Sequence, residues 1–248
     1  MASYLLLIVA ALAAGLINSV AGGGMFIAFP ALVFTGVPSI IANASSTVAV
    51  FPGVLTSAWA YREDFRKSKD FPFVALLITS LLGGMAGALL LLFTPQHTFD
   101  SVMPWLMLGA TLLFALGPRL APMLKRWFHI GPLAVILIQI PIAIYGGYFG
   151  GAIGILMLAT WAMYGLNDIH VMNANRTVMG AAANILAIAL FVFAHKIWWP
   201  QTLVMLLGTS LGGYYGAKMV KKVNPVYVRA FVTLVSTVIT IVFFLRKH

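Results

Sequence analysis

The sequence predicts an all-α polytopic membrane protein with seven or eight transmembrane helices. Of its 248 residues, 62% are hydrophobic and only 8% are charged, and the mean hydropathy is +1.01. A soluble domain is about half apolar and a quarter charged, so this composition is typical of a chain whose surface faces lipid. Apolar runs long enough to cross a bilayer, which needs about 20 helical residues, recur along the whole sequence.

The apolar segments follow one another with short polar or basic loops between them. The first lacks the basic leader of a signal peptide, so we expect it to be retained as the first membrane element. In order, the segments are Tyr4 to Phe34, Ile40 to Ala60, Phe71 to Phe93, Val102 to Gly117, Pro132 to Met163, Ile169 to Ala194, Trp199 to Val220 and Val226 to Leu245.

Two of these segments are too long for one upright helix and too short for two full spans. Glycines interrupt both, at Ala21 to Gly24 in the first and at Gly146 to Gly151 in the second. Glycine costs about 1 kcal/mol in a helix interior and permits a positive φ. Broken membrane helices occur where the freed backbone faces protein or a water-filled cavity. We therefore predict two discontinuous helices that line a site.

An internal repeat divides the chain. Asn43 to Val48 matches Asn173 to Val178, and Leu82 to Ala88 matches Leu211 to Ala217, at offsets of 130 and 129. These matches at nearly one spacing predict two homologous halves of about four elements each. The boundaries that follow are residues 1–120 for the first transmembrane repeat, 121–131 for a cytoplasmic linker and 132–248 for the second repeat.

Basic residues predict how the halves are oriented. The loop from Arg62 to Asp70 and the linker, with Arg119, Lys125 and Arg126, are separated by two spans and so share the cytoplasmic side. If one glycine-broken element does not cross, the loop with Lys218, Lys221, Lys222 and Arg229 also returns to the cytoplasm. That arrangement favours seven spans and an inverted repeat.

Arg176 is the only charged residue well inside a long apolar segment. A guanidinium at membrane depth costs several kcal/mol and stays protonated. Because no Asp or Glu lies inside an apolar run to pair with it, the simplest partner is a small anion held by Arg176 and neighbouring amides and hydroxyls. Alternatively, backbone carbonyls at a broken helix satisfy Arg176 and lock the fold.

The predicted substrate-binding residues come from the two matched segments and the two glycine breaks. The polar ones could instead form interhelical hydrogen bonds, and the glycines could simply permit close packing, which is how we interpret Gly83, Gly87, Gly212 and Gly216. Asp168 is expected to cap the Arg176 helix. The predicted set is Arg176, Asn173, Asn175, Thr177, Asn43, Ser45, Ser46, Thr47, Gly22, Gly23, Gly24, Gly150, Gly151 and Asn18.

The sequence lacks the residues that several classes of function require. The chain has no cysteine, and no metal-ligand cluster, Walker A sequence or Ser/His pair stands in the spans, so we predict no metal, no cofactor and no enzyme. All five carboxylates fall in loops or at span ends, which disfavours a cation antiporter. The basic residues lie in short loops and form no single soluble face, so nucleic acid is not expected as a partner.

Several ordered motifs together resemble the TauE/SafE family of sulfite exporters. They are Asn18 to Gly24, Pro30, Asn43 to Thr47, the glycine-rich run from Tyr145 to Ala152, and Asn173 to Thr177. The resemblance implies secondary transport, by alternating access, of sulfite or an organosulfonate such as sulfoacetate out of the cytoplasm. It places the chain in the cytoplasmic (inner) membrane, with the bilayer and a small anion as partners.

Some questions stay open at this level. An importer of another small anion on the same fold is the alternative, and an intramembrane enzyme or a scaffold is less favoured. The direction of transport, the coupling ion and the oligomeric state, including a homodimer, are not decided by the sequence.

Overall fold

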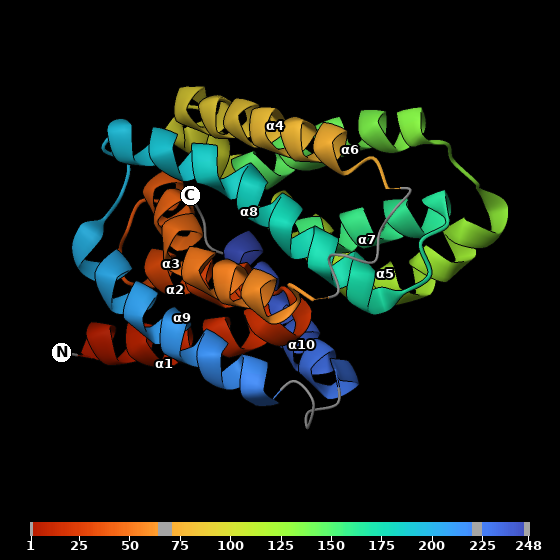
Figure 1. The fold of residues 1–248 in the computed structure, drawn as a ribbon. Helices are drawn as coiled ribbons and strands as arrows, with labels where there is room; N and C mark the ends of the chain where they lie inside the picture. The colour runs from red at the N-terminus through yellow and green to blue at the C-terminus, as the bar shows by residue number, and fades with distance from the viewer. Residues whose placement is uncertain (1, 64–70, 220–224, 246–248) are drawn as a thin grey trace.

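The computed structural model describes residues 2–63, 71–219 and 225–245 (Figure 1). Within these ranges the chain is helical and contains no strand. Five of the described helices are long and apolar enough to cross a membrane, and further apolar helices are shorter. The prediction of an all-α polytopic membrane protein is confirmed.

The helices follow the predicted apolar segments closely. The two predicted discontinuous segments each appear as a pair, α1 with α2 and α6 with α7. In chain order the helices are α1 (Ala2–Ala21), α2 (Met25–Phe34), α3 (Ser39–Ala60), α4 (Phe73–Phe93), α5 (Gln96–Trp127), α6 (Pro132–Tyr148), α7 (Ile153–Tyr164), α8 (Ile169–Phe193), α9 (Trp199–Met219) and α10 (Pro225–Leu245).

The chain reverses direction between α1 and α2. Gly22 has a φ of +72°, which few residues other than glycine adopt. A Cβ built on Gly24 would stand 2.7 Å from the carbonyl oxygen of Ala14, although ten residues of continuous helix would separate the two by about 15 Å. Helix α2 therefore folds back and packs against both α1 and α3. The predicted break at Gly22 to Gly24 is confirmed.

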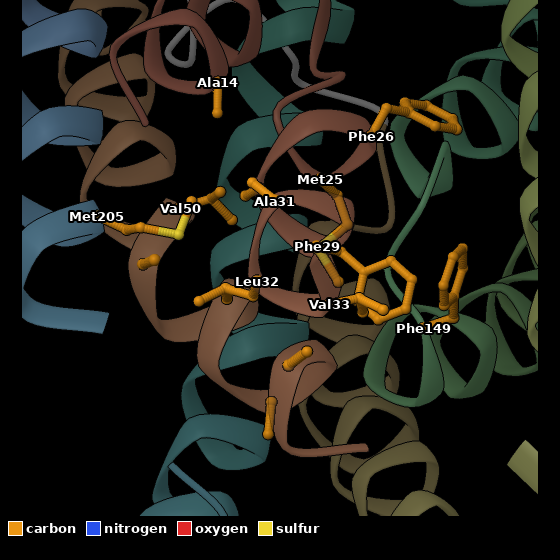
Figure 2. Close-up of a cluster of buried hydrophobic side chains, with 14 of the residues drawn as sticks. Ala14, Met25, Phe26, Phe29, Ala31, Leu32, Val33, Val50, Phe149 and Met205 are labelled. Carbon is orange, nitrogen blue, oxygen red and sulfur yellow. The ribbon is translucent and has the colours of Figure 1, made fainter. Parts of the chain in front are cut away.

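Helix α2 is too short to span a bilayer and is enclosed by protein. Eight of its ten residues are buried, as expected of a helix that is apolar on all sides. Figure 2 shows its side chains packed among neighbouring helices, with Phe29 facing Phe149. The two rings meet edge to face with centroids 5.8 Å apart. This enclosure meets the requirement that interrupted backbone in a membrane be covered by protein.

The second break lies slightly later than predicted. Helix α6 continues through Gly146 and Gly147 and ends at Tyr148, so the break covers residues 149–152. Gly150 has a φ of +81° there. A Cβ on Gly147 would collide with the backbone of Gly84, so the earlier glycines permit close packing within a continuous helix. The predicted start of the break at Gly146 was therefore wrong.

Four other glycines seat the helices of two tight pairs. Gly83 and Gly87 of α4 face α6, and Gly212 and Gly216 of α9 face α1. A Cβ on Gly87 would collide with the backbone of Ile144, and a Cβ on Gly212 would collide with the backbone of Leu12. The interpretation of these four glycines as packing positions is confirmed, because only a residue without a side chain lets the backbones approach so closely.

Two boundaries differ from expectation. Helix α5 runs to Trp127, so the first seven residues of the predicted linker 121–131 are helical, and only residues 128–131 separate α5 from α6. Arg229 lies inside α10, which begins at Pro225, so its assignment to a loop was wrong. Lys221 and Lys222 of that loop lie outside the described residues.

Helix ends gather on two opposite sides of the molecule. In Figure 1 the N-terminus and the connection between α8 and α9 lie on the left, and the connections from α5 to α6 and from α7 to α8 lie on the right. The right-hand side carries Lys125 and Arg126 in the last turn of α5. We refer to it below as the basic side.

Candidate functional site

A cavity of about 80 Å³ lies where the two helix breaks meet α3 and α8. This volume has room for several water molecules or a small ion, since one water needs about 10–15 Å³ by the same measure. Its walls come from α1, α2, α3, α7 and α8. The lining residues are Asn18, Gly22, Met25, Thr47, Val50, Val54, Ser57, Gly150, Ile153, Gly154, Met157, Arg176, Thr177, Gly180 and Asn184.

Arg176 occupies the cavity wall between the two breaks. Its side chain is half-buried, and its Nε is buried without a hydrogen-bond partner. A Cβ on Gly22 would collide with its Nη1, and one on Gly154 would stand 2.9 Å from the same atom. The glycines of both breaks therefore leave space for the guanidinium.

No described carboxylate neutralises Arg176. Glu63 pairs with Arg62 at 3.7 Å, and Asp100 accepts hydrogen bonds from Ser39 and Gln96. The remaining described acid, Asp168, caps α8 by accepting from the backbone N–H groups of the first turn, which confirms its predicted role. Asp64 and Asp70 lie outside the described residues.

Two helix N-termini point their first residues at the same cavity. Met25 begins α2 and Ile153 begins α7, and both line the cavity. The first N–H groups of a helix have no partner within the helix, and the helix dipole places partial positive charge there. With Arg176 between them, these ends give the cavity a positive potential that suits an anion.

Each half contributes one of two matched threonines to the cavity lining. Thr47 and Thr177 both line the cavity. Each hydroxyl donates to a carbonyl of its own helix, Thr47 to Asn43 at 3.0 Å and Thr177 to Ala174 at 2.8 Å. Rotation of either hydroxyl would let it donate to an anion instead.

Several predicted site residues lie behind the lining and connect helices. The Asn43 amide donates to the carbonyl oxygen of Tyr148 at 2.8 Å, next to the second break. Ser45 accepts from the backbone N–H of Trp198 at 2.9 Å. These bonds match the alternative prediction that the polar residues form interhelical hydrogen bonds. They connect α3 to the end of α6 and to the residue before α9.

The other predicted residues outside the lining make local contacts. Ser46 donates to the carbonyl oxygen of Asn43 at 2.9 Å and contacts Met25 Sδ. Asn175 donates to the carbonyl oxygen of Val171 within its own helix. Gly23, Gly24, Gly151 and Asn173 are also absent from the lining.

The sequence prediction did not include two polar residues that lie further along α3 and α8. Ser57 on α3 and Asn184 on α8 both line the cavity. Asn184 follows Arg176 by eight residues, and Ser57 follows Thr47 by ten. At 3.6 residues per turn these spacings leave each within about 80° of its predecessor around the helix, so this periodicity was the signal that could have found them.

The described residues hold no cluster of three or more His, Asp or Glu side chains that could bind a metal ion. The candidate site therefore consists of one guanidinium, two helix N-termini and neutral hydroxyl and amide groups, a set of donors that suits an anion. No pair of described groups in the lining combines a nucleophile with a general base.

Comparison with known proteins gives a consistent result. The family model described as "Sulfite exporter TauE/SafE" matches residues 7–243. A "Probable membrane transporter protein" of Haemophilus influenzae is 31% identical over 92% of this chain and 89% of its own length. "Probable membrane transporter protein YfcA" of Escherichia coli K12 is 28% identical over 93% and 85%. A third relative, "Probable membrane transporter protein ORF9" of a Sinorhizobium species, is 27% identical over 95% and 90%.

The motifs, the helical membrane fold and these matches over nearly the whole chain agree with one another. The chain belongs to the TauE/SafE sulfite exporter family.

Proposed function

We propose that the chain is a secondary transporter that moves a small sulfur-containing anion, sulfite or an organosulfonate such as sulfoacetate, out of the cytoplasm. The observation that carries this proposal is Arg176, a guanidinium that lines a cavity with its Nε unpaired and with no described carboxylate beside it. Keeping such a charge in apolar surroundings costs several kcal/mol. A bound anion offsets that cost each time it arrives.

The donor arrangement suits an anion with several oxygens. A guanidinium offers parallel N–H groups that bind two oxygens at once. The N-termini of α2 and α7 and the hydroxyls of Thr47 and Thr177 border the same cavity and can serve a third oxygen. Sulfite and sulfonate groups each present three oxygens on one sulfur, which this set of donors can bind together.

Alternating access is supported by the pairing of helices across the halves. Helix α1 packs on α9 as α6 packs on α4, and α3 contacts α9 as α8 contacts α4. Gly22 and Gly150, Met25 and Ile153, and Thr47 and Thr177 are matched pairs that border one cavity. We propose that residues 1–120 and 132–248 form an inverted repeat and that its two arrangements expose the cavity alternately.

Charge favours export through the cytoplasmic membrane. Basic residues concentrate on cytoplasmic loops in membrane proteins, so we assign the basic side to the cytoplasm. Outward movement of one negative charge is favoured by about 2.3 kcal/mol per 100 mV of membrane potential. Export therefore needs no coupling ion, whereas import of another small anion on the same fold, the alternative, would need one.

Flux measurements on purified protein in proteoliposomes test the proposal. We expect labelled sulfite, sulfoacetate or isethionate to cross in a protein-dependent way, and an imposed potential to accelerate movement of the anion toward the positive side. Sulfate, with a fourth oxygen, tests how closely the cavity fits. Absence of flux across this panel would contradict transport and favour an enzyme or a scaffold.

A further inference from the structure

A second, larger cavity opens beside the first on the basic side. It has a volume of about 380 Å³ and is bordered by the C-terminal part of α5, by α7, by the start of α8 and by the start of α10. Two of its lining residues are cationic, Lys125 and Arg229, and none of the described residues in its lining is acidic. It is therefore positively charged, like the first cavity, but lies closer to the end of the helix bundle.

Arg229 lines this cavity, and no described acidic residue lines it beside Arg229. It lies in the second turn of α10, and its Nε is buried without a hydrogen-bond partner. Its guanidinium carbon stands 6.0 Å from the centre of the Phe114 ring, at the outer limit of a cation–π contact. Lys125 on the other wall donates one hydrogen bond to the side-chain oxygen of Asn167, which leaves two of the three ammonium donors for a ligand. Arg229 thus resembles Arg176, since each is a partly buried cation whose Nε has no hydrogen-bond partner among the described residues.

The two cavities are neighbours along α7 and α8. On α7, Gly154 borders the first cavity and the next residue, Ile155, borders the second. On α8, Met172 borders the second cavity, and Arg176, one turn later, borders the first. Arg229 is also close enough to Arg176 for the two positive charges to interact. An anion leaving one cavity has only a turn of α7 or α8 to pass.

We propose that the second cavity is a cytoplasmic access site, in which Arg229 and Lys125 capture a small oxyanion before it moves to Arg176. This inference rests on the proposed function for its direction, but the capture itself is a separate property. Clefts that carry charge of one sign raise the local concentration of oppositely charged ligands and accelerate their association. Because such attraction is screened by salt, it should weaken as ionic strength rises.

The absence of cysteine in the natural chain makes the capture directly measurable. A Leu166→Cys substitution places one thiol in the loop between α7 and α8, in the lining of the second cavity. The rate of its modification is compared for two thiosulfonate reagents of similar size, one bearing a sulfonate and one bearing a quaternary ammonium. The full-length protein is used in membrane vesicles, at low and high salt.

We expect the sulfonate reagent to react at least about threefold faster than the cationic reagent at low salt, with the preference reduced at high salt. Adding Arg229→Gln should remove most of the preference, and Arg229→Lys should keep most of it. The matched control is Arg126→Gln, which removes one positive charge from an exposed position on the same side outside the cavity. Equal preferences in the Arg229→Gln and Arg126→Gln proteins would overturn the inference.

Flux in proteoliposomes separates this inference from the proposed function. If transport is correct, Arg229→Gln should lower the flux at low anion concentration by more than at saturation, because capture becomes the slow step. A protein that shows the labelling preference but moves no anion would retain the access site and refute the transporter. A transporter whose concentration dependence and labelling preference are both unchanged by Arg229→Gln would refute the access site alone.

Discussion

The segments Asn43 to Thr47 on α3 and Asn173 to Thr177 on α8 occupy matched places and carry different chemistry. Both contribute a threonine to the cavity. At the fourth position, however, α3 has Ser46, whose hydroxyl is satisfied by Asn43 and Met25, whereas α8 has Arg176 with an unpaired Nε. The two halves share a framework, and one of them supplies the charge.

This difference indicates how a repeated fold produces a single asymmetric site. Two guanidinium groups in one cavity of about 80 Å³ would repel each other, so a charge on one half requires a neutral residue on the other. The neutral half then contributes the N-terminus of α2, the Thr47 hydroxyl and the hydrogen bonds that connect α3 to other helices. The following substitutions test this division of roles.

Arg176→Lys should have the largest effect. Lysine keeps the charge but cannot bind two oxygens through a planar fork, and loss of one charge-assisted hydrogen bond costs about 1.5–3 kcal/mol. We expect anion flux to fall by about 10- to 100-fold while the protein still folds and purifies. The matched substitution on the other half, Ser46→Ala, should change flux by less than about threefold. Wild-type flux in Arg176→Lys would remove Arg176 from the site.

Gly154→Ala should come next, because it displaces the guanidinium without removing it. The new methyl group would stand 2.8 Å from Cδ and 2.9 Å from Nη1 of Arg176. These atoms belong to a flexible side chain, so we expect the guanidinium to move and the backbone to stay in place. We expect about a tenfold loss of apparent affinity with little change in thermal stability. Gly109→Ala, with nothing within 4 Å of its Cβ, is the control and should leave affinity unchanged.

Thr177→Val and Thr47→Val compare the two halves directly. Each removes a hydroxyl from the lining while keeping the side-chain shape. One hydrogen bond is worth about 0.5–1.5 kcal/mol net, so we expect flux to fall by about two- to tenfold for Thr177→Val, which neighbours Arg176. Thr47→Val should have a smaller effect in the same assay, and a larger effect on the α3 side would reverse the proposed roles.

Ser45→Ala should affect transport least and stability most clearly. Its hydroxyl accepts from the backbone N–H of Trp198, and loss of that acceptor leaves a donor unpaired at a cost of about 1–3 kcal/mol. We expect a lower melting temperature in detergent and unchanged apparent affinity for the anion. A selective change in affinity at constant stability would return Ser45 to the binding site.

Most of the fold could be predicted because membrane-spanning helices are recognisable as long apolar segments of the sequence. The break at Gly22 was predictable, since three consecutive glycines strongly disfavour a continuous helix. The second break was misplaced because Gly146 and Gly147 serve packing against neighbouring elements, and glycine composition alone does not separate the two uses. The ends of α5 were not predicted because they contain polar residues such as Gln96 and Lys125 and therefore give no hydropathy signal.

The sequence predicted Arg176 and the two threonines of the candidate site but not Ser57 and Asn184, which also line the cavity. Arg176 and the two threonines stand out as polar residues within apolar runs, and all three line the cavity. Asn43 and Ser45 stand out for the same reason but contact other helices, because a buried polar side chain must bond to something whether or not it binds a substrate. Arg229 was missed since it lies near a helix end, where a cation looks like a topology signal.

The thermal stability of Arg176→Gln, measured with and without anion, tests the central claim most directly. If the guanidinium is an unpaired charge that waits for substrate, its removal relieves a desolvation cost, so the melting temperature without anion should stay equal or rise. Saturating sulfite or sulfoacetate should raise the melting temperature of the wild-type protein by a few degrees and leave that of Arg176→Gln unchanged. A melting temperature that drops without anion, together with equal shifts in both proteins, would mean that Arg176 locks the fold and does not bind the substrate.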